Sequence, residues 1–376
     1  MRTYKIAVMP GDGIGPEVVA GALAVLKAAE ERFGFTTEKR HIAGGANDYL
    51  KTGKLFADYA DELSECEAIL FGSMGDPRVT PGILERGYIL AMRQDFQQSA
   101  NVRPVRLYPG VETPIKNVTP ENCDFVIVRE NTEGSYVGQG STVHEGTPNA
   151  VAMQESLNTR QGIERVVDYA FRLALGRRKK LTLCHKTNVL VAAGKLWQTT
   201  VNELAKLYPE VSVDYCHVDA MCFHMPLDPA RFDVVVTDNL FGDIITDLGA
   251  VIQGGLGVST SANVNLEGTH PSMFEAIHGS APDIAGKGWA NPAGSVLSLS
   301  LLLGHLGEGK AAAAIEAATV RVIGELKAMA GPEMGLNTAE IGQRIAELVA
   351  AGDYDTELIP DPLVSTLATL PASRRG

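Results

Sequence analysis

The sequence predicts an α/β protein, because two hydrophobic periods alternate along the chain. Short β-rich runs predict strands at residues 5–10, 68–71, 124–129, 180–184, 211–217 and 234–237. Longer runs with apolar residues at helical spacing predict helices at residues 17–33, 163–175, 190–207 and 311–329. Such alternation favours a sheet covered by helices. The sequence shows no internal repeat and no low-complexity linker, so we expect interwoven lobes rather than domains in series.

The composition is that of an ordinary globular protein. The chain has 376 residues, 45% of them hydrophobic and 21% charged, enough to bury a large core. Its formal net charge of −12 disfavours nucleic-acid binding, so local arginines would have to hold any anionic ligand. Five scattered cysteines without C-x-x-C spacing are typical of reduced, mostly buried thiols. No signal peptide or membrane-spanning run of ~18 apolar residues is evident, so we expect a soluble, cytoplasmic protein.

The glycine-rich segment Pro10-Gly-Asp-Gly-Ile-Gly-Pro-Glu permits two interpretations. It could be the turn of a Rossmann domain, where a pyrophosphate lies at the start of a helix. However, Pro16 replaces the third glycine of G-x-G-x-x-G, and no acidic residue ends an obvious second strand about 20 residues later. The other interpretation is a tight strand-to-helix turn with Pro16 at the first helical position. A dinucleotide that contacts this loop would do so outside the Rossmann scheme.

Asp243 and Asp247 lie four residues apart in a largely apolar segment. Helical spacing would place both carboxylates on one face, one turn apart, where bare like charges repel. A hard cation such as Mg²⁺ or Mn²⁺ would explain the pair, because such ions prefer oxygen ligands. The alternative is a pair of solvated surface carboxylates. Apolar neighbours such as Phe241 and Ile244 indicate that at least one aspartate points into a cleft.

Several cationic side chains are candidates for binding and catalysis. Arg93 and Arg103 are separated by ten residues, and Arg129 ends a predicted strand. A guanidinium matches a carboxylate with a planar fork of donors, although a single arginine is usually a surface cation. Lys186 follows a predicted strand, where α/β proteins place sites, and is either a general base or a surface lysine. Tyr136 is equally ambiguous by itself.

Residues 274–292 are rich in glycine and polar side chains, which predicts a long functional loop rather than a core strand. The glycines allow the backbone to approach a ligand closely. Asp283 has the chemistry to accept hydrogen bonds from a ribose diol and to repel a 2′-phosphate. The loop is therefore a candidate ligand-binding segment.

Seven blocks together resemble the β-decarboxylating dehydrogenases, the family of 3-isopropylmalate, isocitrate, homoisocitrate and tartrate/D-malate dehydrogenases. They are Gly11-Asp-Gly-Ile-Gly-Pro-Glu, Ala100-Asn-Val-Arg-Pro, Val128-Arg-Glu-Asn-Thr-Glu-Gly, His185-Lys-Thr-Asn-Val, Val218-Asp-Ala-Met, Gly242-Asp-Ile-Ile-Thr-Asp and His278-Gly-Ser-Ala-Pro-Asp-Ile-Ala-Gly-Lys-Gly. The resemblance implies a two-lobed α/β fold with a central sheet flanked by helices, not a Rossmann domain. The larger, cofactor-binding lobe would comprise residues 1–98 and 254–376. Residues 99–253 would form a smaller lobe with the dimer interface and the metal and catalytic residues.

The resemblance also implies the chemistry of the site. Mg²⁺ or Mn²⁺ would be held by the carboxylates of Asp219, Asp243 and Asp247. The malate carboxylate that is lost as CO₂ would be bound by Arg93, Arg103 and Arg129. Lys186 looks like the base that accepts the C2 hydroxyl proton as hydride leaves for NAD, and Tyr136 looks like the acid that protonates C3. Family members are homodimers with shared sites, so Lys186 and Asp219 would come from the partner subunit.

The family's cofactor-binding positions match a set of residues on the N-terminal turn and in the last third of the chain. They are Ile14, Gly255, Glu275, His278, Gly279, Ser280, Ala281, Asp283 and Asn291. Asp283 matches the acidic residue that selects NAD, where NADP-dependent isocitrate enzymes carry a lysine.

Substrate choice is expected to depend on the segment before Arg93. If Arg86, Ile89 or Leu90, and Arg93 lie on one helix, they share a face that would meet the C3 substituent. Isocitrate enzymes carry a serine and an asparagine where this chain has Gly87 and Ile89, and homoisocitrate enzymes carry an arginine at Leu90. These departures disfavour a γ-carboxylate. Isopropylmalate enzymes usually have an acidic residue at Arg86, and Glu133-Gly-Ser-Tyr looks more like the tartrate/D-malate and homoisocitrate branches.

We therefore expect NAD- and metal-dependent oxidative decarboxylation of a D-malate-type acid, namely D-malate, tartrate or a 3-alkylmalate such as 3-isopropylmalate. Isocitrate or homoisocitrate dehydrogenase activity is one alternative. A non-catalytic regulatory subunit of the same fold is another, opposed by the complete set of candidate metal, base and acid residues. Arg86 could face solvent, a carboxylate or the nicotinamide ribose.

Overall fold

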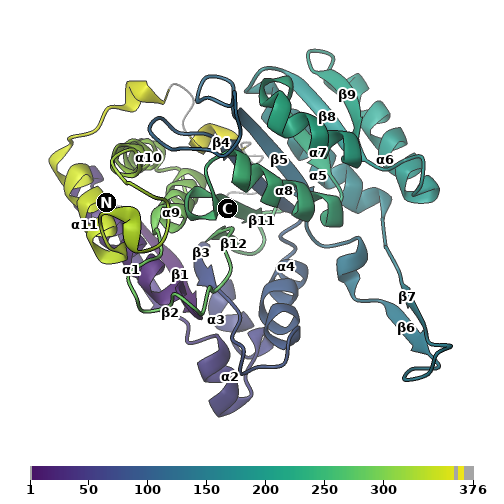
Figure 1. Cartoon of the computed structure of the whole chain (residues 1–376), viewed down its shortest axis with the longest axis horizontal. Coiled ribbons are helices and arrows are strands. Elements are labelled where there is room, and N and C mark those ends of the chain that lie inside the picture. The colour runs from purple at the N-terminus through teal and green to yellow at the C-terminus, as the bar shows by residue number, and fades with distance from the viewer. Residues whose placement is uncertain (1, 360–362, 368–376) are drawn as a thin grey trace.

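A ten-stranded mixed sheet runs through the molecule in the computed structural model, which describes residues 2–359 and 363–367 (Figure 1). The strand order is β2-β1-β3-β12-β11-β4-β5-β10-β8-β9. β11 pairs antiparallel with both β12 and β4, and β4 pairs antiparallel with β5, whereas the outer strands pair in parallel. The strands span Thr3–Gly11 (β1), Thr36–His41 (β2), Ala68–Ser73 (β3), Ala100–Arg106 (β4), Asp124–Glu130 (β5), Lys180–His185 (β8), Ser212–His217 (β9), Val234–Thr237 (β10), Thr260–Val264 (β11) and Ser272–Ala276 (β12).

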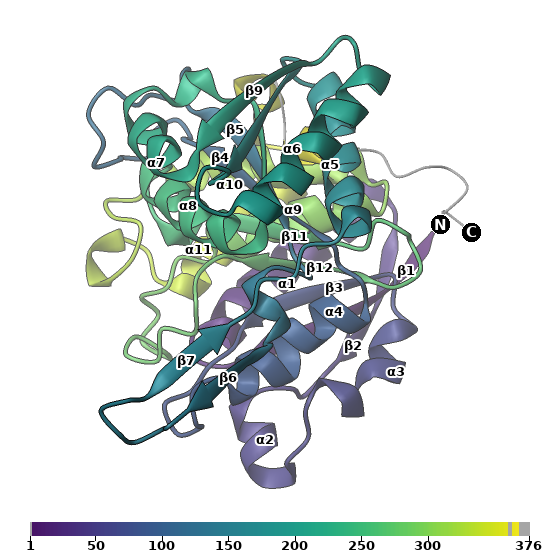
Figure 2. The same cartoon turned by 90° about the vertical axis from the view of Figure 1, so that its right-hand side faces the viewer.

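Helices cover this sheet along its whole width (Figures 1 and 2). α1 packs on α9 and α11 beside one half of the sheet, and α5 and α8 both pack on β4 and β5 in the other half. The helices span Gly15–Phe33 (α1), Ala46–Thr52 (α2), Ala60–Ser64 (α3), Ala91–Asp95 (α4), Arg160–Leu175 (α5), Val191–Leu204 (α6), Val218–Leu227 (α7), Asn239–Ile252 (α8), Ala293–His305 (α9), Gly309–Ile323 (α10) and Thr338–Ala351 (α11). Among the described residues, no helix has the length and apolar character needed to cross a membrane.

Local sequence signals explain the ends of several helices. α1 has a proline in its first turn and ends at Gly34, whose φ of 76° is left-handed, a conformation that glycine adopts without steric cost. α5 and α8 begin after Thr159 and Asp238, whose side chains accept hydrogen bonds from the backbone N–H groups of Gly162 and Phe241. α9 is buried along nearly its whole length, as expected for a helix that is apolar on all sides.

The α/β prediction is confirmed, and the strands predicted at residues 5–10, 68–71, 124–129, 180–184, 211–217 and 234–237 all form. The helix predicted at 311–329 was too long, because it ends at Ile323 before Gly324 and a series of turns. The helix predicted at 190–207 finishes as a 3₁₀ turn, Ala205–Leu207. Residues 274–276, predicted as loop, are buried strand in β12, where tertiary packing overrides the polar character of the segment that follows.

Within the single sheet, the strands of residues 1–98 and 254–376 are neighbours, and so are those of residues 99–253. β2, β1, β3, β12 and β11 lie side by side and come from residues before 98 or after 254. β4, β5, β10, β8 and β9 come from residues 99–253. The lobe boundaries themselves stay a prediction. A separate hairpin of β6 (Gly140–Val143) and β7 (Val151–Gln154) extends away from the strands of residues 99–253 and is exposed (Figure 2).

The cysteine prediction also holds. Cys66, Cys123, Cys184 and Cys216 are buried free thiols, and Cys222 is partly buried.

Candidate functional site

The N-terminal glycine-rich segment forms a tight strand-to-helix turn, as the second interpretation of it predicts. The backbone N–H groups of Asp12 and Ile14 donate to the carbonyls of Ser73 and Ser280, each at 2.8 Å. Gly13 has a φ of +58°, and a Cβ there would lie 1.8 Å from the Ser280 carbonyl oxygen. These N–H groups are used within the fold, so the turn does not present the free donors that a Rossmann turn offers to a pyrophosphate.

The pair Asp243 and Asp247 lies one turn apart on α8, as the spacing predicts. Burial alone would raise the pKa of Asp243, but the guanidinium groups of Arg129 and Arg103 outweigh it and lower that pKa below its ordinary value. The pKa of Asp247 is raised by burial, and the neighbouring Asp243 charge adds to the increase. The two carboxylates are therefore distinct: Asp243 is partly exposed and held as an anion by the arginines, whereas Asp247 is exposed.

Arg103, Arg129, Tyr136 and Asp243 form one connected cluster, which we call the arginine–Asp243 group. Arg129 Nη1 donates to Asp243 Oδ1 at 2.5 Å, and the Tyr136 hydroxyl donates to Asp243 Oδ2 at 2.5 Å. Arg103 Nη1 lies 3.8 Å from Asp243 Oδ1. Burial and the hydrogen bond to Asp243 raise the pKa of Tyr136, which keeps its hydroxyl protonated. The structure thus brings together residues from two strands (β4 and β5), the 3₁₀ turn Ser135–Val137 and helix α8.

This group carries an excess of buried positive charge. Arg103 and Arg129 are 6% and 1% exposed. Burial, followed by the repulsion of Arg129, lowers the pKa of Arg103 to about 10. Arg93 lies near enough to lower the pKa of Arg129 as well, after the effect of burial. Such a cluster favours an anionic ligand, because an added carboxylate relieves the repulsion between the guanidinium groups.

Arg93 connects the cluster to the other half of the sheet. Its Nη2 donates to Glu275 Oε1 at 3.0 Å, and Glu275 also accepts from Asn263 Nδ2 at 2.8 Å. Glu275, predicted at a cofactor position, is buried at the end of β12. The ion pair therefore joins a candidate substrate residue to a candidate cofactor residue.

Lys186 and Asp219 form a second, separate unit, which we call the Lys186–Asp219 pair. Lys186 Nζ donates to Asp219 Oδ1 at 2.6 Å, and the Asp219 side chain is 67% exposed. The hydrogen bond from Lys186 lowers the pKa of Asp219. Within the described part of one chain, no three acidic, histidine or cysteine side chains gather as a metal site, so Asp219 does not join Asp243 and Asp247.

The segment before Arg93 differs from the predicted regular α-helix. Glu85–Leu90 is a π-helix that leads directly into α4, and the Ala91 N–H donates to the Arg86 carbonyl. The wider π turn changes the angle between successive side chains around the helix axis. The prediction that Arg86, Leu90 and Arg93 share one face assumes α-helical spacing, so it does not apply here. Arg86 is exposed, whereas Ile89 and Leu90 are partly buried. Gly87 faces the side chain of Leu55, where an added Cβ would lie 2.7 Å from Leu55 Cδ2.

The predicted cofactor positions fall on neighbouring segments of the structure. Ile14 packs in a small apolar cluster with Ala281, and its N–H bonds to Ser280. Asp283 and Gly279 are exposed on the loop that follows β12. Burial lowers the pKa of His278, whose Nδ1 lies 3.0 Å from the Gly279 carbonyl. Further along the chain, Asn291 Oδ1 accepts from the N–H of Ala293 at the start of α9, and Gly255 has a φ of 120°.

The sequence analysis missed two residues that bind the arginines of the arginine–Asp243 group. Asn239 Oδ1 accepts from both Nε and Nη2 of Arg129, at 3.0 and 2.7 Å. Thr246 Oγ1 accepts from Arg103 Nη1 at 2.6 Å. The helical face that carries Asp243 would have indicated both, because positions 239, 243 and 246 are spaced by one turn.

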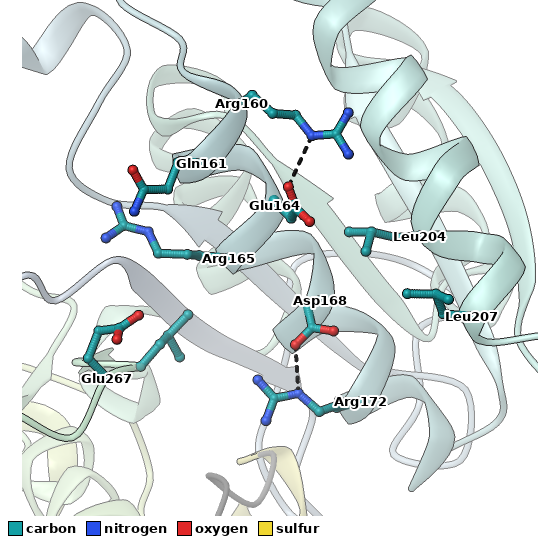
Figure 3. A pocket seen from close by; sticks show the side chains of 10 residues that line it. Arg160, Gln161, Glu164, Arg165, Asp168, Arg172, Leu204, Leu207 and Glu267 are labelled. Atoms are coloured by element: carbon teal, nitrogen blue, oxygen red, sulfur yellow. Dashed lines mark hydrogen bonds and ion pairs between the residues drawn. The ribbon is translucent and has the colours of Figure 1, made fainter. Parts of the chain in front are cut away.

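A groove of about 570 Å³ lies elsewhere, between α5 and the turn that joins β11 to β12 (Figure 3). Two pairs of its charged side chains bond to each other, Arg160 with Glu164 at 3.1 Å and Arg172 with Asp168 at 3.0 Å. None of the predicted site residues lines it. The groove therefore lies apart from the arginine–Asp243 group.

Comparison with known proteins places these features in a family. Residues 5–345 match the isocitrate/isopropylmalate dehydrogenase family. The 3-isopropylmalate dehydrogenase of Thermobifida fusca is 52% identical over 93% of this chain and 98% of its own length. That of Nocardia farcinica is 52% identical over 92% of this chain and 100% of its own. The crystal structure of isocitrate dehydrogenase from Methylococcus capsulatus superposes with a TM-score of 0.82 at 36% identity, covering 92% of this chain and 99% of that one.

Proposed function

Because the chain belongs to the isocitrate/isopropylmalate dehydrogenase family, a family of decarboxylating oxidoreductases, we propose that it converts 3-isopropylmalate to a 2-keto acid and CO₂ with NAD as hydride acceptor. The relatives at 52% identity carry the name 3-isopropylmalate dehydrogenase, whereas the isocitrate dehydrogenase structure is 36% identical. This difference favours a 3-alkylmalate over isocitrate.

The arginine–Asp243 group is the observation that carries the proposal. A malate-type substrate has a carboxylate that must be held and then lost, and buried guanidinium groups suit that task. Arg103 and Arg129 are desolvated, so their interaction with a carboxylate is weakly screened. We assign Arg93, Arg103 and Arg129 to this carboxylate.

Asp243 and Asp247 suit a divalent cation. Their ligand set is oxygen only, and the two carboxylates lie one helical turn apart on the same face of α8. Together with Asp219 they would hold Mg²⁺ or Mn²⁺. When bound, the ion would act as a Lewis acid at the C2 oxygen.

Two side chains would move protons. Lys186 would accept the proton of the C2 hydroxyl as hydride leaves for NAD, and Tyr136 would donate a proton to C3 after CO₂ is lost. The position of the Tyr136 hydroxyl, which donates to Asp243 Oδ2 at 2.5 Å inside the arginine–Asp243 group, supports the second assignment.

A homodimer with shared sites would unite the two units. The Lys186–Asp219 pair does not reach Asp243 and Asp247 within the described part of one chain. α7 and α8 pack together and expose apolar side chains beside the site, including Phe223 at 63% and Ile244 at 53%. A second copy that covers these helices would bury the apolar surface and supply Lys186 and Asp219 to the facing Asp243.

The cofactor would bind in the lobe of residues 1–98 and 254–376, along the loop that carries Asp283. An exposed Asp283 is available to a ribose diol and disfavours NADP by charge repulsion. The packing of Ile14 against Ala281 brings the N-terminal turn next to the loop that carries Asp283.

The alkyl group of the substrate would meet the π-helical segment. Ile89 and Leu90 are partly buried and apolar, and they precede Arg93 directly. Gly87 is packed against Leu55, so it leaves no room for the serine of isocitrate enzymes without a local shift. A γ-carboxylate would find no partner among these residues.

A substrate panel tests the proposal. D-malate, the tartrates, 3-isopropylmalate, isocitrate and homoisocitrate are each supplied with NAD or NADP, with Mn²⁺ or with a chelator. We expect 3-isopropylmalate with NAD to give the highest kcat/KM, and chelation to abolish turnover. Faster turnover of isocitrate than of every other acid would contradict the substrate assignment, and turnover that survives chelation would contradict the metal assignment.

A further inference from the structure

The hydroxyl of Tyr215 makes an unusually dense set of contacts around Lys186. It accepts from the Thr187 N–H at 3.1 Å and donates to the His185 carbonyl at 3.1 Å. It also lies 2.9 Å from Thr187 Oγ1 and 2.8 Å from His217 Nδ1. One hydroxyl on the edge strand β9 thus holds the backbone on both sides of Lys186.

The backbone after Lys186 is fixed as well. The Lys186 carbonyl accepts from the N–H groups of Val189 and Leu190, at 3.0 and 2.9 Å. On the facing helix α6, a Cβ at Gly194 would lie 2.6 Å from Thr187 Cα, so that helix approaches this turn closely. The Tyr215 contacts complete this arrangement from the β9 side.

His217 extends the same network toward Asp219. The parallel register places His217 beside His185, the residue before Lys186. His217 also occupies the N-cap position of α7, the helix whose first turn carries Asp219. One chain of contacts therefore runs from the backbone of Lys186 through Tyr215 and His217 to the start of the Asp219 helix.

We infer that Tyr215 and His217 are positioning residues that hold Lys186 and Asp219 in one fixed relative geometry. This inference rests on the proposed function, in which both residues act at the reacting substrate. Neither Tyr215 nor His217 would touch the substrate. A tyrosine hydroxyl has one proton and two lone pairs, which suffice to donate to the His185 carbonyl and to accept from the Thr187 N–H and from an Nδ1–H tautomer of His217. The contact with Thr187 Oγ1 then competes with these three bonds and does not add a fourth. Supporting hydrogen bonds of this kind are worth about 10–100-fold in metal affinity or activity.

The test is Tyr215→Phe in the full-length enzyme, assayed with 3-isopropylmalate, NAD and Mn²⁺. We expect kcat to fall about 10–100-fold while the substrate KM changes less than about twofold, because the arginine trio is untouched. Calorimetric titration with Mn²⁺ alone should show weaker binding by about 10-fold, because Asp219 is less well oriented. The matched control is Tyr208→Phe, whose hydroxyl bonds to Asp168 in the same half of the sheet, away from Lys186. It should keep wild-type kcat.

His217 provides an independent check by rescue. His217→Ala should lower kcat as Tyr215→Phe does, and His217→Asn, whose amide can replace the Nδ1 contact, should restore most of it. A Tyr215→Phe enzyme with a lower Tm but wild-type kcat and Mn²⁺ affinity would overturn the inference, as would equal kcat for His217→Ala and wild type. Lys186→Met separates the two proposals. If it keeps wild-type turnover, the proposed function fails; if it is inactive while Tyr215→Phe is unaffected, only the positioning role fails.

Discussion

The arginine–Asp243 group and the Lys186–Asp219 pair differ sharply in their surroundings. The first is buried and internally bonded, with Arg129 1% exposed and held by Asn239 and Asp243. The second is a single exposed contact between a lysine and an aspartate that is 67% exposed. The difference is that the arginines of the first unit find their polar partners within one chain, whereas the second unit is open to solvent.

The cost of removing charge from water explains this difference between the two units. Charges that are removed from water need partners, and Asn239, Thr246 and Asp243 supply them to the arginines. An exposed ion pair is screened and contributes little to stability, so the Lys186–Asp219 contact alone fixes neither side chain. Covering the pair would strengthen its electrostatic interactions. The comparison thus predicts that formation of the proposed homodimer changes the surroundings of the Lys186–Asp219 pair more than those of the arginine–Asp243 group.

Mixing two inactive variants gives the largest expected effect. Lys186→Met and Asp243→Asn should each lower kcat by about 10²–10⁴-fold, because each removes a reacting group or a metal ligand. If sites are shared, a mixed dimer contains one site with both residues intact, so coexpression of the two variants should recover about a quarter of the wild-type activity. An activity no higher than that of either parent would place both units in the same chain.

Arg129→Lys tests the buried unit directly. Lysine cannot reproduce the contacts that the planar guanidinium makes with Asn239 and Asp243. We expect kcat/KM for 3-isopropylmalate to fall about 100-fold, in line with the loss of a buried charged hydrogen bond. Arg160→Lys, which alters an exposed pair with Glu164 and Glu203, should stay within about twofold of wild type. Equal losses in the two variants would remove the distinction between buried and exposed arginines.

Leu90→Ala asks whether the π-helical segment, rather than either charged unit, selects the alkyl group. Removing apolar contact should lower the ratio of kcat/KM for 3-isopropylmalate to that for D-malate by about 10-fold. Leu207→Ala, at a side chain that is 70% exposed, is the matched control. An unchanged ratio would exclude Leu90 from the substituent pocket. Arg86→Glu is expected to leave the substrate ranking unchanged, because Arg86 is exposed.

The smallest expected effect is on stability. Burial raises the pKa of Asp238, at the start of α8, to about 6. A carboxyl whose pKa is raised by folding stabilises the folded state below its ordinary pKa near 3.8, and that contribution is lost as the pH rises through about 6. Asp238→Asn retains a capping side chain. The free energy of unfolding of this variant, relative to that of wild type, should therefore be roughly 1–3 kcal/mol higher at pH 8 than at pH 4.

Urea unfolding at both pH values measures this difference. Asp219→Asn is the counterpart in the exposed unit. The lowered pKa of Asp219 stabilises the folded state above its ordinary pKa, so this variant should change the pH dependence of stability only slightly and in the opposite direction, because the pair is exposed to solvent. A pH-dependent gain for Asp219→Asn equal to that for Asp238→Asn would contradict the contrast between the two regions.

The sequence by itself determined the features that depend on short-range periodicity and residue type. The spacing of Asp243 and Asp247 predicted their common face on α8, and alternating strands and helices predicted the α/β class. The seven sequence blocks predicted the family that the comparisons confirm. α9 escaped prediction because it is apolar on all sides and carries serines, one of which, Ser298, bonds back to the Gly294 carbonyl of the preceding turn.

Only the tertiary structure decided which distant residues meet. The pairing of Arg93 with Glu275 requires β12 to lie beside β3, although the two strands are about 200 residues apart in the chain. The separation of Asp219 from Asp243, the π-helical turn before Arg93 and the Tyr215 network are set in the same way. Local periodicity carries no information about sheet order or side-chain packing between remote segments, so these contacts follow from burial of the whole sheet.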